Sequence, residues 1–346
     1  MTTISTLFGI ALPIIQAPMA GVQASAMAIA VSNAGGLGSL PAATFSPSAL
    51  RAELESIRAQ SAKPCNVNFF CHTPPTPSEA REAAWRAALA PYFAEFGFDA
   101  GAIPAGPGRA PFTDEVADAI EPFAPEVVSF HFGLPSPALL ARVRAWGAKV
   151  IASATTVDEA RWLEAHGVDA VIAQGLEAGG HRGIFLSEDL TTQLGTFALL
   201  PQIVAAVRVP VIAAGGIADE AGVRAARALG AAGVQVGTAY MLCPEATTSS
   251  PHRAALKGGA AGHTALTNLF TGRPARGIVN RLMRELGPIS NAAPEFPLAT
   301  GAIAPLRAAA ERAGSGDFSP LWSGQNARGC REIPAARLTL ELAAGW

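Results

Sequence analysis

Eight short hydrophobic runs, each bounded by glycine, proline or asparagine, divide this 346-residue sequence into regular units. Most of the runs are hydrophobic at consecutive positions instead of alternating with polar residues. Consecutive apolar residues are typical of parallel strands that are covered on both faces. The predicted strands are Ile14–Ala17, Gly36–Leu40, Cys65–Asn68, Val127–His131, Lys149–Ser153, Ala170–Ala173, Val211–Ala214 and Val234–Val236.

Amphipathic stretches separate these runs, with apolar residues at threefold and fourfold spacing that predicts helices. Thr156 and Asp219 are suitable N-caps, and a glycine follows several stretches where a left-handed residue ends a helix. These glycines are Gly35, Gly147, Gly167 and Gly230. The predicted helices are Ala24–Asn33, Pro47–Gln60, Pro137–Trp146, Val157–His166, Phe197–Val207 and Glu220–Leu229.

Strand and helix repeated in this way predict an α/β protein with a (β/α)8 TIM barrel. The alternative is a doubly wound open sheet. That fold usually carries a GxGxxG fingerprint directly after its first strand, and the fingerprint is missing here.

Two segments are longer than the strand–helix repeat of a barrel requires. An insertion after strand 3, at about residues 73–122, includes the stretch Ile103–Pro111, rich in proline and glycine. A second long segment follows the eighth strand and runs to Trp346. We therefore expect a barrel over residues 1–245 and a C-terminal helical extension over 246–346 that caps the active site at the barrel mouth.

Charge and composition exclude several classes of function. The chain has 25 Lys+Arg against 27 Asp+Glu and no basic run, so nucleic acid is not an expected partner. No run of 18 apolar residues exists, and the first basic residue is Arg51, so neither a membrane span nor a secretory signal is expected. We expect a cytoplasmic protein. Its four cysteines contain no CxxC pair, so neither a disulfide framework nor a metal site is expected.

The carboxyl ends of barrel strands carry the site in this architecture. Gly215 and Gly216 follow the seventh predicted strand, and Gly237 and Thr238 follow the eighth. Glycines let backbone N–H groups approach an anion, and a helix that begins at Thr238 would direct its N–H groups toward the same ligand. The sequence therefore predicts a phosphate-bearing ligand, although the glycines would also suit simple tight turns.

Amides and histidines follow other strands. Asn68 and Gln174 could bond the pyrimidine edge of a flavin, which needs donors and acceptors together, or could be structural amides that tie loops. Gly179 and Gly180 let a loop lie flat against a cofactor, so that His181 projects over it and exchanges a proton. The alternative interpretation is that His181 is a solvent-facing loop histidine.

Other candidates are weaker. His131, at a strand end, is the second candidate for the proton-exchanging residue, and the alternative is a core histidine with a structural role. Glu177 is the nearest acid and equally suits a turn. Hydrolase, P-loop and metalloprotease motifs (GxSxG, GK[ST], HExxH) are absent.

With these residues in place, the sequence resembles the nitronate monooxygenase family, which are FMN-dependent (β/α)8 enzymes. The resemblance runs in family order through short segments, with a familiar tail near the end of the chain. The segments are Pro13–Met19 (PIIQAPM), Gly35–Ser39 (GGLGS), Asn66–Phe69 (NVNF), Ala178–Gly183 (AGGHRG), Ala214–Ile217 (AGGI), Gln235–Thr238 (QVGT) and the tail Phe318–Gln325 (FSPLWSGQ).

The resemblance implies an FMN site, an alkyl nitronate as substrate, O2 as co-substrate, and a carbonyl compound plus nitrite as products. It implies that Ala17, Pro18 and Met19 lie against the flavin ring. The remaining FMN-binding residues implied are Asn68, Gln174, Gly179, Gly180, Gly215, Gly216, Gln235, Val236, Gly237 and Thr238. The catalytic residues implied are His181 as base, with His131 and Ser290 helping to hold the nitronate.

One departure concerns the substrate pocket, where the resemblance implies several tyrosines. This chain has only Tyr92 and Tyr240, so Phe112 and Phe296 are the candidates to replace them. A monomer or a homodimer is expected.

The same motifs occur in FMN-dependent NAD(P)H:quinone reductases and enoyl-[acyl-carrier-protein] reductases, which form the alternative function. A non-catalytic FMN- or phosphate-binding regulator is a third class.

Overall fold

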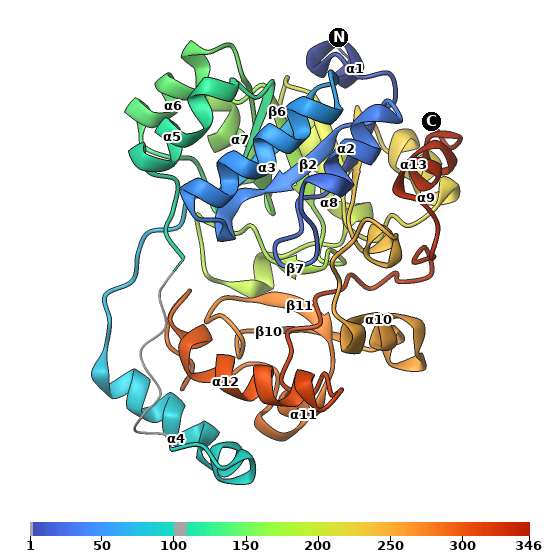
Figure 1. The fold of residues 1–346 in the computed structure, drawn as a ribbon. Helices are drawn as coiled ribbons and strands as arrows, with labels where there is room; N and C mark the ends of the chain where they lie inside the picture. Colours follow the sequence, from blue (N-terminus) through green and yellow to red (C-terminus); the bar gives the residue numbers. More distant parts are fainter. Residues whose placement is uncertain (1–2, 100–108) are drawn as a thin grey trace.

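Eight parallel strands form the centre of the computed structural model, which describes residues 3–99 and 109–346 (Figure 1). Neighbouring strands follow the order β1-β9-β8-β6-β5-β4-β3-β2, and a parallel bridge between Ile15 and Leu37 joins the two ends. The predicted (β/α)8 barrel is therefore confirmed. The strands are β1 (Ile14–Gln16), β2 (Gly38–Pro41), β3 (Cys65–Phe70), β4 (Val127–His131), β5 (Lys149–Ala154), β6 (Ala170–Gln174), β8 (Val211–Ala214) and β9 (Gly233–Val236).

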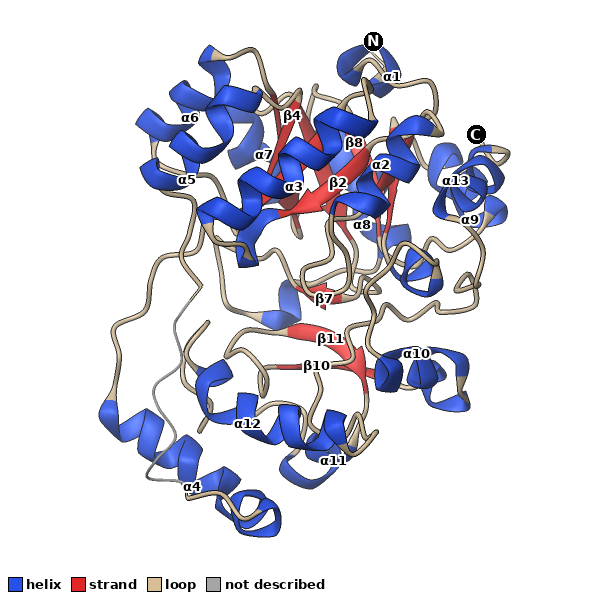
Figure 2. Ribbon diagram, in the orientation of Figure 1, coloured by secondary structure: helices blue, strands red, loops and turns tan. Residues whose placement is uncertain are grey.

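A ring of helices surrounds these strands (Figure 2). The predicted N-caps are confirmed, because the side chains of Thr156 and Asp219 accept hydrogen bonds from the backbone of the first turn. The four predicted helix-ending glycines all have positive φ. The helices are α2 (Ser25–Asn33), α3 (Pro47–Gln60), α5 (Asp114–Ile120), α6 (Pro137–Ala145), α7 (Val157–Ala165), α8 (Thr196–Ala206), α9 (Glu220–Ala228) and α13 (Ala335–Ala343).

The last helix, α13, returns to the barrel from the far end of the chain. It packs between α2 and α9, in the position that the helix after the eighth strand would occupy. Leu338 and Leu342 are buried there. The segment directly after β9 is only a short 3-10 turn, Thr238–Leu242. The last helix of the chain therefore completes the helical ring.

Side-chain alternation divides the barrel interior into two layers. The layer at the amino ends of the strands is apolar, and helix α1 (Ile4–Phe8) closes it with Ile4 and Phe8. Its strand residues include Ile15, Leu37, Val127, Ile151, Ile172 and Ile212. Nearer the carboxyl ends, the inward positions carry polar side chains instead. These face the mouth of the barrel.

The insertion and the extension share a second hydrophobic core below the barrel mouth in Figure 1. Helix α4 (Glu79–Phe96) of the insertion packs on α12 (Ala299–Arg312), and Trp85 donates a hydrogen bond to Ala299 O at 3.2 Å. We call the unit around this second core, which includes α4, α12 and the helix Arg281–Leu286, the lid. Helix α5 of the insertion instead packs on α3 in the barrel ring, and residues 100–108, most of the Pro/Gly-rich stretch, lie outside the described residues.

A small antiparallel sheet lies between the lid and the barrel, in the order β10-β11-β7. Its strands are β7 (Gly180–His181), β10 (Thr264–Thr267) and β11 (Ala275–Ile278). The other helices of the extension are α10 (Ser250–Lys257) and α11 (Arg281–Leu286). Within residues 3–99 and 109–346, no helix is both long and apolar enough to span a membrane.

Candidate active site

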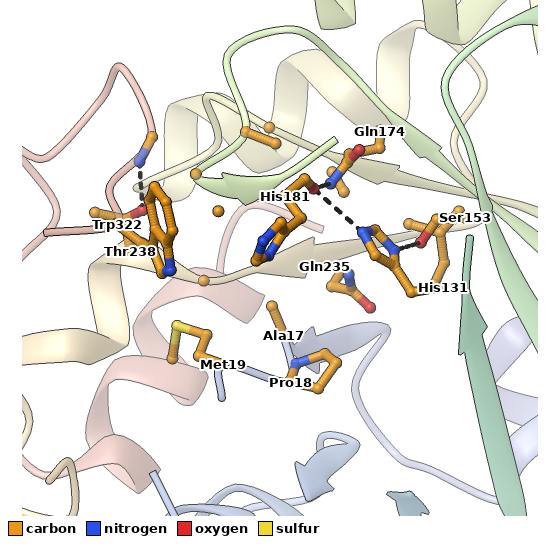
Figure 3. Close-up of a pocket in the computed structure, with 18 of the residues that line it drawn as sticks. Ala17, Pro18, Met19, His131, Ser153, Gln174, His181, Gln235, Thr238 and Trp322 are labelled. Carbon is orange, nitrogen blue, oxygen red and sulfur yellow. Dashed lines mark hydrogen bonds between the residues drawn. The ribbon is translucent and has the colours of Figure 1, made fainter. Parts of the chain in front are cut away.

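A cavity lies at the carboxyl ends of the barrel strands, where the sequence predicts the site (Figure 3). It brings together nearly all the predicted residues. The predicted residues that line it are Ala17, Pro18, Met19, Asn68, His131, Gln174, Gly179, Gly180, His181, Gly215, Gly216, Gln235, Gly237 and Thr238.

Two predicted residues are not among the described residues that line the cavity. Val236 is buried in the layer between the strands and the helices, because alternation on β9 turns it outward when Gln235 faces inward. Ser290 lies in the lid, where its backbone N–H and C=O bond the side chain of Asn268 at 2.9 Å each.

The cradle expected for phosphate consists of Gly215, Gly216, Gly237 and Thr238. A Cβ at Gly215 would lie 2.9 Å from Thr196 Oγ1, and its φ of +113° also requires glycine. The backbone amides of Gly216 and Thr238 donate to no acceptor in the described part of the chain. Thr238 begins a 3-10 turn, so its N–H is free to meet an anion.

The tail of the chain closes over this cradle. Gly324 N donates to Thr238 Oγ1 at 2.9 Å, and Asn326 Nδ2 donates to Gly216 O at 3.0 Å. A Cβ at Gly179 would lie 2.5 Å from Gly324 N, so this glycine is required where the loop after β6 meets the tail. The cradle expected for phosphate thus brings together three distant parts of the chain.

Three inward amides differ in what they bond. Gln174 uses both ends of its amide on the loop that follows, donating to His181 O at 3.0 Å and accepting from Gly183 N at 2.7 Å. Asn68 donates to Ser129 Oγ at 2.9 Å. Gln235 Oε1 is buried without a hydrogen-bond partner in the described chain, although its side chain lines the cavity. An unpaired buried acceptor calls for a donor from a ligand.

His181 occupies the centre of the cavity wall on β7. Its Nε2 lies 2.9 Å from Thr271 Oγ1, and that hydroxyl can donate to Arg273 O at 3.4 Å. Thr271 then accepts from Nε2–H, which leaves Nδ1 of His181 as the acceptor for a ligand. Burial first, and then repulsion from Arg109, lower the pKa of His181 well below its usual value, so the ring is neutral at pH 7.

His131 has both ring nitrogens engaged. Nε2 lies 3.2 Å from His181 O, which can only accept, so Nε2 carries the proton. Nδ1 then accepts from Ser153 Oγ at 3.1 Å (Figure 3). Burial lowers the pKa of His131 to about 4. This histidine therefore supports the backbone of His181, with no free nitrogen lone pair.

Arg182 anchors the loop that carries His181. Its buried guanidinium donates to the carbonyls of Gln174 and Gly175 at 2.7 and 2.6 Å and to Gln193 Oε1 at 3.0 Å. Arg182 could have been identified from the sequence, because it directly follows His181 in the AGGHRG segment. Glu177 is a turn carboxylate, accepting from Thr196 N at 2.7 Å.

Further cavity residues were not singled out from the sequence. Ser129 and Ser153 are inward positions that alternation on β4 and β5 could have identified. Trp322 lies in the tail segment, with its ring 5.5 Å from that of His181. Phe70 and Arg109 also line the cavity. Arg109 is a single cation in an uncharged stretch, and no motif marks it.

The two tyrosines lie away from this cavity. Tyr92 packs on Phe318 in the lid core, and Tyr240 is buried with its hydroxyl 2.9 Å from Thr339 Oγ1. Of the two candidate replacements, Phe296 lies beside the site, its ring 5.3 Å from that of His181. Phe112 packs on Phe69 and Phe130 in the outer core of the barrel instead.

Comparisons with known proteins cover nearly the whole chain. Residues 1–345 match the family model described as nitronate monooxygenase. A nitronate monooxygenase of Pseudomonas aeruginosa is 45% identical over 338 residues, which is 96% of this chain and 95% of the relative. One from Paraburkholderia phytofirmans is 44% identical over 343 residues, 97% of this chain and 92% of the relative.

A solved structure agrees with these relatives. The nitroalkane oxidase from Streptomyces ansochromogenes superimposes with a TM-score of 0.90 and 40% sequence identity. The match covers 99% of this chain and 97% of that one. Fold and sequence therefore indicate the same family over the full length.

Proposed function

Because the chain belongs to the nitronate monooxygenase family of oxidoreductases, we propose that it oxidises alkyl nitronates with O2 to a carbonyl compound and nitrite. The observation that carries the proposal is the cavity at the barrel mouth. It combines an anion cradle, an unpaired buried amide oxygen and a neutral histidine in one space.

The residues present fit an FMN cofactor. The free amides of Gly216 and Thr238 would hold its phosphate, as backbone N–H groups hold anions elsewhere. Gln235 Oε1 would accept from the N–H of the flavin's pyrimidine edge, with Ala17, Pro18 and Met19 against the ring. When bound, FMN supplies the electron transfer between substrate and O2.

His181 and its supports provide orientation and proton chemistry. With Nε2–H held by Thr271, Nδ1 can accept a hydrogen bond or remove the α-proton of a neutral nitroalkane. A nitronate has already lost that proton and does not need the base, and its oxygens require hydrogen-bond donors or a cation instead of the Nδ1 lone pair. The lowered pKa of His181 makes it a weaker base, which favours nitronates over nitroalkanes as substrates.

The lid and the aromatic wall restrict water around the substrate. Phe70, Phe132 and Phe296 form a small buried cluster, with ring centres 5.0 to 6.0 Å apart. His181 packs against all three rings. Such a wall strengthens the hydrogen bonds that the few polar groups make to a charged ligand.

Steady-state turnover tests this proposal. Purified protein loaded with FMN is given ethylnitronate, and O2 consumption and nitrite release are followed together. We expect the rates of O2 consumption and of nitrite release to depend on enzyme concentration and on FMN. Turnover with NADPH and a quinone or enoyl substrate, and none with nitronate, would reject the proposal and favour a reductase.

A further inference from the structure

Arg109 is the only formally charged side chain among the described residues that line the cavity. In the described chain it has no ion-pair partner, and residues 100–108 beside it contain no aspartate or glutamate. Its guanidinium is partly buried. Burying a cation without a counter-ion is costly, so the cavity is suited to an anion at this position.

The phosphate cradle is on the other side of the barrel. The backbone of Arg109 lies beside the end of β3, where His72 Nε2 donates to Arg109 O at 2.9 Å. Gly215 and Gly216 follow β8, which is four strands from β3 in either direction around the ring. The anion that neutralises Arg109 is therefore a different one from the phosphate.

The other charges that act directly on Arg109 and on its histidine neighbours are also cations: Arg307 acts on Arg109, and Arg273 acts on His72 and His181. His72 is partly desolvated and its ring packs 4.8 Å from that of Phe296, while Phe70 continues the aromatic wall. After burial, Arg109 makes the largest contribution to the lowered pKa of His181. The guanidinium and the His181 ring therefore line the same cavity close enough for the charge of Arg109 to disfavour protonation of the ring, and an anion in this space would be stabilised by the guanidinium.

We infer that Arg109 is the counter-ion of the substrate's nitronate group and selects the ionised nitronate against the neutral nitroalkane. This inference rests on the proposed function. A nitronate is planar and carries its negative charge on two oxygens of one nitrogen. The planar fork of a guanidinium matches such a pair of oxygens, as it matches a carboxylate. A neutral nitroalkane would leave the charge of Arg109 without a counter-ion.

Nitrate binding tests the site without turnover, because nitrate is a planar anion with no α-carbon to oxidise. Calorimetric titration of the FMN-loaded, full-length protein compares wild type with Arg109→Gln and Arg109→Lys. We expect Arg109→Gln to weaken nitrate binding at least ten-fold and Arg109→Lys to weaken it less. Arg81→Gln is the matched control, since it removes an exposed arginine of the same insertion that pairs with Glu295. It should bind nitrate as wild type does.

Kinetics supply the second readout. Arg109→Gln should raise KM for ethylnitronate at least ten-fold, with a smaller effect on kcat and no change in KM for nitroethane. Equal nitrate affinity in Arg109→Gln and wild type would overturn the inference. So would a ten-fold loss of FMN affinity with nitrate affinity retained, because Arg109 would then serve the cofactor. Nitrate binding that needs Arg109, in a wild-type protein without nitronate turnover, would overturn the proposed function and support the anion site.

Discussion

At the scale of single residues, the surroundings of His181 determine what the cavity can do. The ring is neutral because it is buried beside cations, and its loop is fixed by Arg182 and His131. A neutral ring can accept a proton or a hydrogen bond through Nδ1, but its basicity is low. On the proposed function, His181 therefore matters most for substrates that must still lose a proton.

Replacing His181 by asparagine tests that distinction. His181→Asn keeps a polar side chain but removes the base, so bound FMN should be retained. Activity on nitroethane should fall by about 10²-fold or more, the usual contribution of a general base, while activity on preformed ethylnitronate falls less. Initial rates with both substrates measure the difference. Equal losses on the two substrates would contradict the role of His181 as a base.

Gly215 tests the anion cradle at the same scale. Gly215→Ala places a Cβ 2.9 Å from Thr196 Oγ1 and strains a φ of +113°, so the cradle must shift. We expect FMN affinity, measured by fluorescence titration of the apoprotein, to fall at least ten-fold. Gly147→Ala is the matched control, because Gly147 also has positive φ but has open space around it, at the end of α6. If both variants bind FMN equally well, the cradle assignment is wrong.

At the scale of elements, the sequence predicted the barrel strands closely because each is a short apolar run between turn residues. All eight predicted strands overlap the observed ones, and two match at both ends, Val127–His131 and Val211–Ala214. The glycine-containing strand ends likewise identified most of the cavity. Local sequence determines both features, so a single chain reveals them.

Long-range packing could not be predicted in the same way. The sequence gives no sign that α4 of the insertion packs on α12, more than 200 residues later in the chain, to form the lid core. Arg109 and Trp322 reach the cavity only through the insertion and the extension. Val236 is predicted from its place in the QVGT segment and Ser290 from the family resemblance, and neither source specifies side-chain direction or loop path.

The return of α13 to the barrel ring gives a prediction for one element. Leu338 is 1% exposed between α2 and α9, whereas Leu340 on the same helix is 56% exposed. Leu338→Ala should lower the free energy of unfolding by about 2–5 kcal/mol, the usual cost of truncating a buried leucine. Leu340→Ala should change it by less than about 0.5 kcal/mol. Urea denaturation measures both, and similar effects would contradict the packing of α13.

At the scale of the whole molecule, the cavity lies between the barrel and the lid, whose hydrophobic cores are the two largest among the described residues. The barrel supplies the cradle and the amides, while the lid and the tail supply Trp322 and the cover over the cradle. Histidines whose pKa is lowered by desolvation lie along this junction, among them His131, His181 and His252. His252 Nε2 donates to Trp322 O at 3.1 Å, which links α10 to the tail that carries Trp322.

These histidines predict how stability depends on pH. Burial lowers the pKa of His131 and of His252 to about 4, against about 6.5 for an unfolded histidine. Below pH 6.5 the unfolded chain binds protons that the folded protein does not, so stability falls as pH falls toward 4. Each histidine contributes about 1.4 kcal/mol per pH unit within this window.

Thermal melting at pH 7, 6 and 5 measures this slope. The melting temperature should decrease steadily toward pH 5. His252→Gln keeps a donor for Trp322 O but cannot titrate, so its melting temperature should depend less on pH. A melting temperature that does not change between pH 7 and pH 5 would contradict the neutral, buried state of these histidines.

We propose above that the cavity holds FMN and passes electrons from a nitronate to O2. The most direct measurement is the absorbance spectrum of the purified, FMN-loaded protein before and after anaerobic addition of ethylnitronate. We expect a yellow protein whose flavin absorbance is bleached by ethylnitronate, and not by NADH or NADPH, and recovers when air is admitted. Bleaching by NADH or NADPH alone, or a protein that FMN cannot colour, would contradict it.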